Sequence, residues 1–508
     1  MDLSLDKLRL EAKLLQRAWI AREAVAVERL HRHPPRLDMT TLKRADFLYV
    51  IALENGFESW PRLKWAAETV GLDKAGRLQR LKIALFNNRP QLAKALLDEH
   101  PDLAEGHFGL QVALYDRGAV AKALAEDPTL AVEARGPRRP IVHLAFSCWL
   151  KARPELEQDM LAIAEMLVRY GADVNDGQPV APGNDHVLSV LYGAIGHSNN
   201  MALGQWLLDQ GADPNDNESL YHATELGHHA GLKMLLAAGA NPTGTNALLR
   251  ALDFNDHVAV QMLLDHGARA DDFNDAEVGG ESPWVVPALH QAARRNCDAQ
   301  MVELLLKAGA DPQRRYKGAT AYGYARVHGN HAVFSAIEAQ QGKSELTAEE
   351  TRLAAAAEGL DQPGQYIDPA QLPEAYATLL HELVGQEGRL DHVTRLVELG
   401  LPWDAPDGQG LPPVQLAGWE GRPEMMAYFL KLGPDLSHVN SYGGTLLGSI
   451  LHGAENNPDR DNRDHMTCLE LALHEGVALP RADIGMIGRE DIRAFLEDWA
   501  EARPGQVI

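Results

Sequence analysis

A short phrase recurs along this chain of 508 residues, a leucine-rich run that ends in glycine. Glycine after an apolar helical run is typical of a helix that ends in a left-handed backbone, so each copy predicts a helix end. The clear copies are LVRYGADVND (167–176), LLDQGADPND (207–216), LLAAGANPTG (235–244), LLDHGARADD (263–272) and LLKAGADPQR (305–314). Weaker copies are LVELGLPWDA (396–405) and FLKLGPDLSH (429–438).

The distance from a predicted helix start to the next of these glycines is nearly constant. It is 22 residues for 189→211, 20 for 219→239 and 22 for 287→309, whereas the connector from glycine to the next start varies from 7 (239→246) to 20 (267→287). Two short helices and a turn fit the constant interval. Such constancy is expected where neighbouring helix pairs bury each other's apolar faces and leave the connectors exposed. The predicted N-terminal residues are Ser189, Ser219, Asn246, Pro287, Thr320, Thr378, Pro412 and Thr445.

The stretch ALHQAARRN…MVELLLKAGADP (288–312) resembles an ankyrin repeat, with its T-P-L-H-x-A opening and Gly-Ala-Asp-Pro end. Residues 378–400 and 412–433 resemble degenerate copies. The resemblance implies an all-α solenoid of stacked helix pairs with helical N- and C-terminal caps. It also implies a binding scaffold, without specifying a ligand. The segment GFESWPRLKWAAE (56–68) resembles the leader of a group of bacterial ankyrin-repeat proteins.

The repeat pattern divides the chain into four predicted parts. Residues 1–70 form an N-terminal helical cap, because an uncovered terminal repeat would expose its core. Residues 71–342 form a first ankyrin-repeat stack, and residues 378–508 form a second stack with a C-terminal helical cap. Between them the register lapses, so 343–377 is either a degenerate repeat or a connector.

A cluster of polar residues near His290 raises the question of a reactive centre. The resemblance instead places His290, with His143, His222 and His381, at the repeat's structural histidine position, where the ring bonds backbone or cap hydroxyl groups. We favour that structural role. His222, His228 and His229 do not have zinc-ligand spacing, and Cys297 has no triad partner that the sequence reveals.

No other catalytic motif survives inspection of the sequence. GKS (342–344) lacks the upstream glycine of a phosphate-binding loop, and HELVG (381–385) lacks the second histidine of a zinc-protease helix. We therefore predict a protein that is not an enzyme and that holds no metal or cofactor.

The charge balance limits the class of partner. The 48 basic and 71 acidic residues give a net charge of −23 (48 − 71), which disfavours nucleic acid and anionic membranes, since both require a basic surface. A basic protein partner is allowed but not required. Three widely separated cysteines and the absence of an apolar run of about 20 residues predict a cytoplasmic protein.

The resemblance implies that a partner binds at the connectors, or fingers, and on the concave face of the first helices. Long fingers at 172–188 and 268–286 flank short ones at 212–218 and 240–245, which predicts a low notch between two walls. The second wall joins acidic residues to a tryptophan, a combination common at interfaces, although the tryptophan could instead pack on its own repeat. The predicted contacts in this wall are Asp271, Asp272, Asp275, Glu277, Glu281 and Trp284. Those on the inner helices are Arg294, Arg295, Arg326, His328 and Trp419.

Three functions are consistent with these features. The favoured one is a non-enzymatic scaffold that binds another protein through its fingers and concave face. The first alternative is an acidic inhibitor or immunity protein for a basic toxin or nuclease. The second is an unrecognised enzyme or small-molecule binding protein. The sequence leaves the partner and the oligomeric state open.

Overall fold

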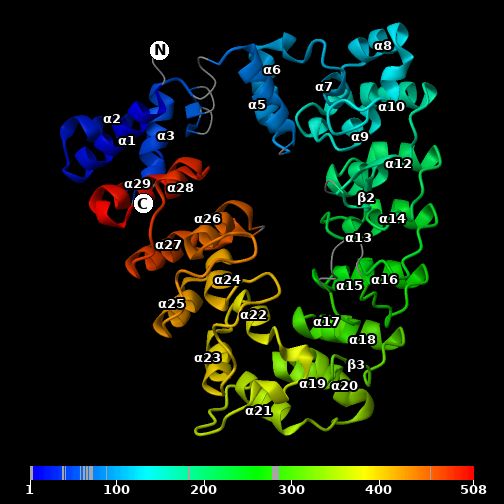
Figure 1. Cartoon of the computed structure of the whole chain (residues 1–508), viewed down its shortest axis with the longest axis vertical. Coiled ribbons are helices and arrows are strands. Elements are labelled where there is room, and N and C mark those ends of the chain that lie inside the picture. Colours follow the sequence, from blue (N-terminus) through cyan, green and yellow to red (C-terminus); the bar gives the residue numbers. More distant parts are fainter. Residues whose placement is uncertain are drawn as a thin grey trace. The chain divides into compact units, whose positions relative to one another are not determined.

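The structure of the protein is a computed structural model that spans residues 1–508. It describes all residues except 1–3, 37–38, 41, 58, 61–62, 65–66, 68–71, 87, 181–182, 277–284 and 458, and the side chains of 482 and 485–486 are also outside the description. Contacts divide the chain into unit 1, residues 1–71 and 347–508, and unit 2, residues 72–346 (Figure 1). Each unit is described by itself.

Unit 2 is a row of helix pairs. The first helices of successive pairs pack on one another, as α13, α15, α17 and α19 do, and the second helices form a parallel layer, as α12, α14, α16 and α18 do. The first helices are α5 (Lys74–Phe86), α7 (Phe108–Ala113), α9 (Pro140–Ala145), α11 (Val190–Tyr192, continued by the π-turn Gly193–His197), α13 (Ser219–Ala223), α15 (Ala247–Leu252), α17 (Ala288–Arg294) and α19 (Ala321–His328). The second helices are α6 (Pro90–Glu99), α8 (Arg117–Glu126), α10 (Glu157–Arg169), α12 (Met201–Asp209), α14 (Ala230–Ala237), α16 (His257–Asp265), α18 (Ala299–Lys307) and α20 (His331–Gln341).

The recurring glycines end helices as the sequence predicted. Gly171, Gly211, Gly239, Gly267 and Gly309 all have φ between 91° and 99°. The amide that follows each glycine donates to the carbonyl of a leucine five residues earlier, as Ala240 does to Leu235 at 3.0 Å. This is the Schellman arrangement, which satisfies carbonyls that a helix end would leave unpaired. The prediction of a left-handed glycine at these positions is confirmed.

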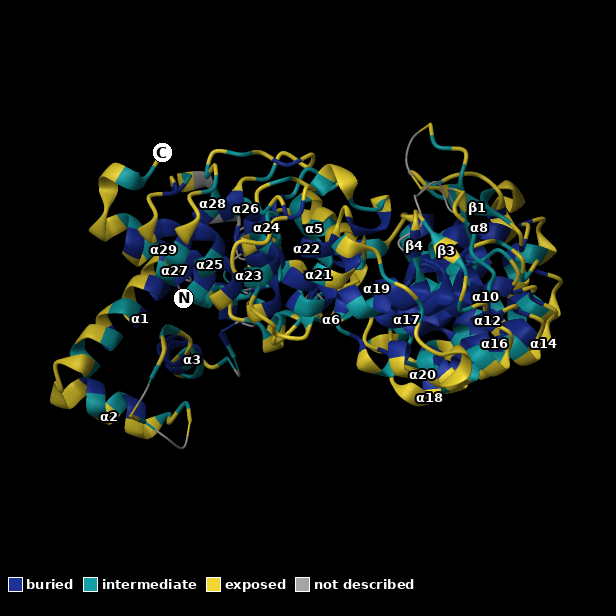
Figure 2. Cartoon of the chain, turned by 90° about the horizontal axis from the view of Figure 1, so that it is seen from below, coloured by how far each residue is buried: buried dark blue, intermediate teal, exposed yellow. Residues whose placement is uncertain are grey.

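The same leucine carries the core of each pair. Leu167, Leu207, Leu235, Leu263 and Leu305 are all fully buried between the two helix layers. Figure 2 shows buried residues along the middle of unit 2, around α17, with exposed residues on its rims. Full burial of a leucine side chain is worth roughly 1.5–3 kcal/mol, so the repeated leucine is a main source of cohesion between pairs.

Three of the predicted helix caps make no cap bond, namely Ser219, Asn246 and Thr378, whose hydroxyl instead donates to Glu382 at 3.0 Å. Ser189 and Thr320 accept the backbone amides of Tyr192 and Gly323, as predicted. Ser219, in contrast, lies inside α13, and the carboxylate of Asp216 accepts its amide at 2.8 Å. Asn246 precedes α15 but has a left-handed φ of 58° and makes no cap bond.

A competing partner explains each wrong cap. Asp216 is three residues before Ser219 and is a stronger acceptor because it is charged. The side chain of Asn246 instead donates to the carbonyl of Asn274 at 3.0 Å and accepts the amide of Asn274 at 2.9 Å. At Asn246 the predicted cap was thus lost to a contact from the next connector, whereas at Ser219 a nearby carboxylate is the acceptor instead.

The connectors carry the few strands of the structure. Strands β1 (Gly177–Pro179) and β2 (Val187–Ser189) form an antiparallel hairpin in the first long finger, with Gly177 opposite Ser189. Strands β3 (Arg315–Tyr316) and β4 (Ala319–Thr320) form a smaller hairpin before α19. The second long finger is described only over 268–276 and 285–286, so the predicted notch stays a prediction.

Unit 1 contains helix pairs and further helices from both ends of the chain. Helices α22, α24 and α26 pack in one row, and α25 packs on α27. Helix α3 packs on α1 and on α29, and Arg9 pairs with Glu490 at 2.8 Å. The helices are α1 (Leu5–Ile20), α2 (Ala24–Arg32), α3 (Arg44–Glu54), α21 (Ala348–Ala357), α22 (Leu379–Val384), α23 (Leu390–Glu398), α24 (Pro413–Trp419), α25 (Pro423–Lys431), α26 (Leu446–Asn456), α27 (His465–His474), α28 (Arg481–Met486) and α29 (Glu490–Ala502).

The structure is thus all-α with two small hairpins among its described residues, as predicted. In the lapsed segment 343–377, Thr347 and Glu350 form a capping box that starts α21, which packs on α23. The predicted boundaries at 1–70, 71–342, 343–377 and 378–508 stay a prediction. Among the helices that the structure describes, none combines the length and apolar content that a bilayer crossing requires.

Candidate functional site

A continuous row of polar contacts joins three successive helix pairs of unit 2. We call this row the charged ladder. It runs from the end of the β1–β2 hairpin across α13 and α15 to the end of α17, along the layer of first helices (Figure 1). Its members are His186, Glu218, His222, Glu225, Arg250, Asp253, Gln291, Arg294 and Arg295.

The first half of the ladder alternates imidazole and carboxylate. Glu218 lies between two rings, with Oε1 at 2.6 Å from Nε2 of His186 and Oε2 at 3.1 Å from Nε2 of His222. The other nitrogen of His222, Nδ1, is 3.0 Å from Oε2 of Glu225. Glu225 in turn accepts from Nε of Arg250 at 2.7 Å. The ring of His222 is therefore held on both sides by carboxylates.

The second half gathers around one buried carboxylate. Asp253 has a side chain only 5% exposed and accepts from Arg295 Nε at 2.8 Å. It also pairs with Arg250 and accepts from the side-chain amide of Gln291. Arg294 donates to Oε1 of Gln291 at 2.7 Å. Several donors converge on this one carboxylate, so Asp253 fixes the positions of its partners.

Aromatic rings shield the middle of the ladder from water. The guanidinium of Arg250 lies 5.1 Å from the ring centroid of Phe254 and 5.8 Å from that of Tyr221. The ring of His222 lies 4.9 Å from that of Tyr192. Cation–π contacts of this kind add to ion pairing because they hold the guanidinium plane in one orientation.

The ladder sets the charge state of His222. Burial lowers the pKa of this ring, but the hydrogen bonds and charges of Glu218 and Glu225 outweigh burial and raise the pKa to about 9. His222 is then a cation at neutral pH. Burial raises the pKa of Glu225, and the hydrogen bonds to His222 and Arg250 outweigh it, so that this pKa lies below its ordinary value. Ion pairs therefore join all of these groups at neutral pH.

The other repeat histidines bind backbone carbonyls. Nε2 of His290 is 3.2 Å from the carbonyl of Ala319, Nε2 of His381 is 3.1 Å from that of Ala405, and Nε2 of His143 is 2.9 Å from that of Arg135. Burial lowers the pKa of His290 to about 4 and also lowers the pKa of His143 and His381. These rings are neutral struts. The structural role predicted for His222 is wrong, because carboxylates and not backbone groups hold its ring.

The predicted acidic wall lies partly outside the described residues. Glu277, Glu281 and Trp284 fall in the segment 277–284, which the structure does not describe. Asp271 accepts the backbone amide of Asp311 at 2.9 Å, and Asp272 pairs with Arg269 at 2.7 Å. Asp275 is exposed. Asp272 thus contacts its own connector and Asp271 contacts the next one, and a partner contact at any of the three acids stays a prediction.

The predicted contacts on the inner helices divide into two groups. Arg294 and Arg295 belong to the charged ladder, and Arg295 is 41% exposed. Arg326 lies over the ring of Phe334 at 4.8 Å and donates to the hydroxyl of Tyr322 at 3.0 Å, so it is held between α19 and α20.

The structure corrects the prediction for His328. This residue is buried, with its ring stacked on that of Tyr324 at 4.0 Å, because Tyr324 lies one helical turn earlier on α19. A partner therefore has no access to it. Trp419 of α24, in unit 1, is half-buried against the ring of His452 at 5.1 Å.

Sequence reasoning missed Glu218, Glu225, Arg250 and Asp253 as members of a site. A signal was present, because His222 and Arg250 are 28 residues apart (250 − 222), and so are Glu225 and Asp253 (253 − 225). Equal spacing of charges by one repeat length brings them side by side in a stack. The acid-rich composition of the whole chain hid this local order.

In the part of the chain that the structure describes, we find little support for a metal site or a catalytic nucleophile. No group of three histidine, cysteine or acidic side chains there has the arrangement of a metal site. Cys297 is buried, and burial raises the pKa of its thiol to about 12. A thiol with so high a pKa is a poor nucleophile.

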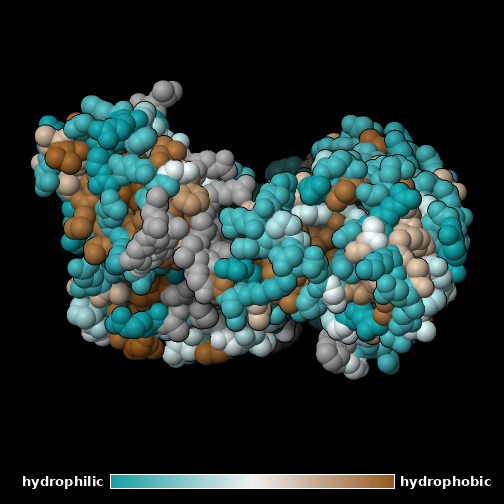
Figure 3. Space-filling model, turned by 90° about the horizontal axis from the view of Figure 1, so that it is seen from above, coloured by the Kyte–Doolittle hydropathy of each residue, from teal (hydrophilic) through white to brown (hydrophobic). Residues whose placement is uncertain are grey.

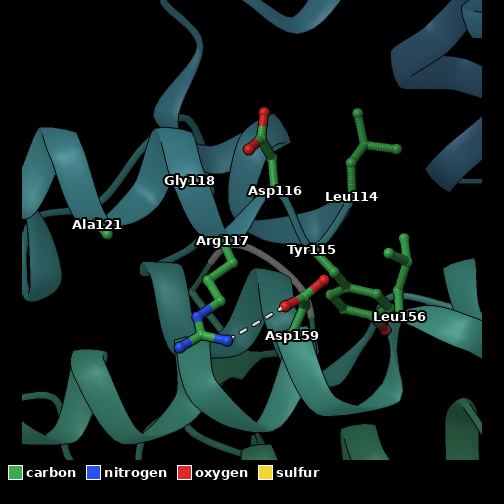
Figure 4. A pocket seen from close by; sticks show the side chains of 8 residues that line it. All are labelled: Leu114, Tyr115, Asp116, Arg117, Gly118, Ala121, Leu156 and Asp159. Carbon is green, nitrogen blue, oxygen red and sulfur yellow. Dashed lines mark ion pairs between the residues drawn. The ribbon is translucent and has the colours of Figure 1, made fainter.

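A shallow depression near α8 and α10 has its polar groups already in use. Figure 4 shows Arg117 reaching toward Asp159, with which it pairs at 3.6 Å, whereas the side chain of Asp116 points away from them. The carboxylate of Asp116 accepts the amide of Ala119 and caps α8. The hydroxyl of Tyr115 donates to the carbonyl of Ser147 at 2.9 Å. The depression, of about 470 Å³, therefore offers little free polar chemistry.

Unit 1 exposes apolar side chains on its first two helices. Leu10 and Leu14 of α1 are one turn apart and more than half exposed, and Ile20 and Val25 follow at the turn to α2. In Figure 3 hydrophobic atoms stand among hydrophilic ones at the left, where Figure 1 places α1 and α2. Exposed apolar residues that are one turn apart form a surface stripe, although nothing in the structure covers it.

Residues 287–317, which contain α17, α18 and β3, match the family model of the ankyrin repeat. The chain therefore contains an ankyrin repeat at these residues. The human ASB11 ankyrin repeat domain is similar at 21% identity and a TM-score of 0.35, over 47% of this chain and 99% of that one. The ankyrin repeat domain of Bcl-3 is similar at 20% identity and a TM-score of 0.34, over 46% and 98%. No curated protein matches the chain.

Ankyrin repeats generally mediate protein–protein interaction and are non-enzymatic modules. The charged ladder connects the first helices of three helix pairs, one of which, α17, lies in the matched segment. The side chains of His222, Arg250 and Arg295 in this row are partly exposed and are fixed in position by their partners. They can therefore bind a polar surface without first becoming ordered.

Proposed function

We propose that this protein is a non-enzymatic scaffold that binds another protein along the charged ladder and the fingers beside it. The observation that carries the proposal is the continuous order of the ladder across three repeats, from His186 to Arg295. Side chains that are already fixed lose little conformational freedom on binding, so a pre-organised polar row favours specific association.

The signs of the charges indicate what the partner presents. Glu218, Glu225 and Asp253 alternate with His222, Arg250 and Arg295, so the ladder is not uniformly acidic. Such a pattern is complementary to a surface that carries both signs, and it discriminates against surfaces in the wrong register. This argues for a partner of mixed charge in preference to a uniformly basic toxin or nuclease, whose support is the net charge of −23 alone.

The state of the cysteines indicates where such a scaffold would act. Cys148, Cys297 and Cys468 are all free and buried. Free thiols persist in a reducing environment, so we place the scaffold in the cytoplasm.

The experiment compares capture of partners from native lysate by three full-length proteins. These are the wild type, Arg295→Ala on the ladder, and Lys307→Ala on the second helix of the same pair. Lys307 is a matched control because it is an exposed cation that pairs only with Glu303 among the described residues. A captured protein is then purified and its affinity measured by calorimetry.

We expect Arg295→Ala to weaken binding of the purified partner by about tenfold or more, because it removes a fixed charge at the interface. Lys307→Ala should bind like the wild type. Equal binding of all three proteins would contradict a role for the ladder. A captured small molecule that the ladder variant loses would favour the alternative of a small-molecule binding protein.

A further inference from the structure

A second surface of unit 2, distant in sequence from the charged ladder, has the features of a docking groove. An opening of about 870 Å³ lies between α5, α7 and α9 and is bordered by the loop 135–138. Successive first helices such as α7 and α9 or α17 and α19 pack closely on one another, whereas α5 makes far fewer contacts with α7. The opening thus exposes side chains that close packing would cover in other repeats.

The apolar side of this groove is open to solvent. Phe86, at the end of α5, is 73% exposed, and Ile83 on the same helix is about half exposed. Phe108 and Phe146 contribute buried rings to the lining. An exposed phenylalanine beside a cavity is an unfavourable arrangement in water and is typical of sites that bury it against a partner.

The polar side of the groove is basic. Lys82, Arg135 and Arg138 line it together with His107 and His143, and among the described lining residues none is Asp or Glu. This is unusual in a chain with 71 acidic and 48 basic residues. Arg135 at the rim pairs with Glu133, whereas Lys82 makes no ion pair with a described residue. The groove is therefore a basic spot on an acidic protein.

Arg138 is the central cation of the groove. Its guanidinium lies 4.9 Å from the ring centroid of Phe146 and 5.9 Å from that of Phe86, and its Nε donates to the side chain of Gln178. No described carboxylate lies within ion-pair distance, and burial lowers its pKa without an acidic neighbour to oppose the shift. Partly buried cations are normally paired, so an anion is the missing partner here.

We propose that this groove binds an acidic amphipathic segment of a partner protein. Apolar side chains of that segment cover Ile83 and Phe86, and one of its carboxylates pairs with Arg138. A further carboxylate pairs with Lys82 at the rim. A single-chain fatty acid would satisfy only one of these cations, so the distribution of charge favours a peptide with several acids.

The proposal is tested with the full-length protein and a displayed library of random peptides. Selected peptides are synthesised with a fluorophore and their binding is measured by fluorescence anisotropy. The groove variants are Phe86→Ala, whose exposed side chain is not needed for folding, and Arg138→Gln. The matched controls are Val258→Ala, an exposed apolar residue of unit 2 outside the groove, and Lys307→Ala, an exposed cation of α18 outside both the groove and the ladder.

We expect the selected peptides to combine leucine or phenylalanine with aspartate or glutamate. Phe86→Ala and Arg138→Gln should each weaken them by about tenfold or more, and the two controls should bind like the wild type. Selection of basic or uncharged peptides, selection of none, or binding that Phe86→Ala leaves unchanged would overturn the proposal. Displacement of a selected acidic peptide by dodecanoate at equal concentration would also overturn it, in favour of an anionic lipid. Because no ladder residue lines the groove, this outcome and that of the ladder experiment are independent.

Discussion

The helix pairs α13/α14 and α17/α18 contain a histidine at the same repeat position and use it in opposite ways. His290 of α17 is 1% exposed, neutral, and directed at the carbonyl of Ala319. His222 of α13 is partly exposed, cationic at neutral pH, and held between Glu218 and Glu225. One position of the repeat thus provides a strut in one pair and a charged contact in another.

The neighbours on the helix explain the difference. Residues four before and three after a helical position lie on the same face. Around His222 these are Glu218 and Glu225, whereas around His290 they are Val286 and Ala293. Two carboxylates raise the pKa of the first ring, whereas the second has no such carboxylates and burial is the largest cause of its lowered pKa. The role of a repeat histidine is therefore decided by its immediate helical context more than by the repeat itself.

The largest expected effect is a loss of stability, and it tests whether the pairs α13/α14 and α17/α18 have equivalent cores. Leu235→Ala in α14 and Leu305→Ala in α18 should each lower the free energy of unfolding by about 2–5 kcal/mol, because both leucines are fully buried at equivalent positions. The measurement is urea unfolding followed by circular dichroism. Val258→Ala on exposed α16 is the control and should change the stability by about 0.5 kcal/mol or less. A much smaller loss at Leu235 would mean that the pairs differ in packing as well as in charge.

The next effect concerns the neutral strut. The folded pKa of His290, about 4, lies below the ordinary 6.5, so its contribution to stability is present above pH 6.5 and is lost as the pH falls toward 4. We expect His290→Gln to be less stable than the wild type at pH 7 and to lose less of its remaining stability between pH 6.5 and 4. Thermal unfolding over this pH range measures both. If the stability of the wild type and of the variant fell equally with pH between 6.5 and 4, His290 would not be the neutral ring described above.

The cationic histidine should show the opposite dependence. The folded pKa of His222, about 9, lies above 6.5, so its stabilisation is complete below pH 6.5 and is lost as the pH rises through 9. His222→Gln should therefore cost more stability at pH 6 than at pH 9.5. Titration of the ring by NMR gives the pKa directly, and Glu218→Gln should lower it. A ring that titrates near 6.5 would remove the contrast with His290.

The smallest effect separates stability from recognition. Arg295 is 41% exposed, so its ion pair with Asp253 is worth about 1 kcal/mol or less, and less at high salt. Arg295→Ala should shift the unfolding midpoint only slightly, and added NaCl should reduce the difference from the wild type. The same variant is expected to weaken partner binding strongly. A large loss of stability would instead make the ladder a structural feature.

Much of the fold was predictable from local patterns. The glycines of the recurring phrase have the predicted left-handed backbone, and the leucine before them is buried every time. Local rules failed where a contact from another segment competed, as at Asn246, whose side chain pairs with Asn274 and not with its own helix. The burial of His328 was likewise not readable from the sequence, because it depends on packing between α19 and its neighbours.

The candidate site was less predictable than the fold. Arg294 and Arg295 were predicted as contacts from their place on an inner helix, but their partners Gln291 and Asp253 were not. Asp253 and Arg295 are 42 residues apart (295 − 253), with a variable connector between them. The sequence does not reveal such a pairing until the stacking of repeats is known.

The sequence by itself determined the repeating unit, because helix length, a leucine to bury and a glycine that tolerates a left-handed backbone are local properties of the chain. Only the tertiary structure decided which charges meet. The stacking of helix pairs brings His186, Glu218, Arg250 and Asp253 into one row, and beside α5 no described carboxylate pairs with Arg138. Electrostatic contacts depend on separations of a few ångströms between residues far apart in sequence, and packing sets those separations.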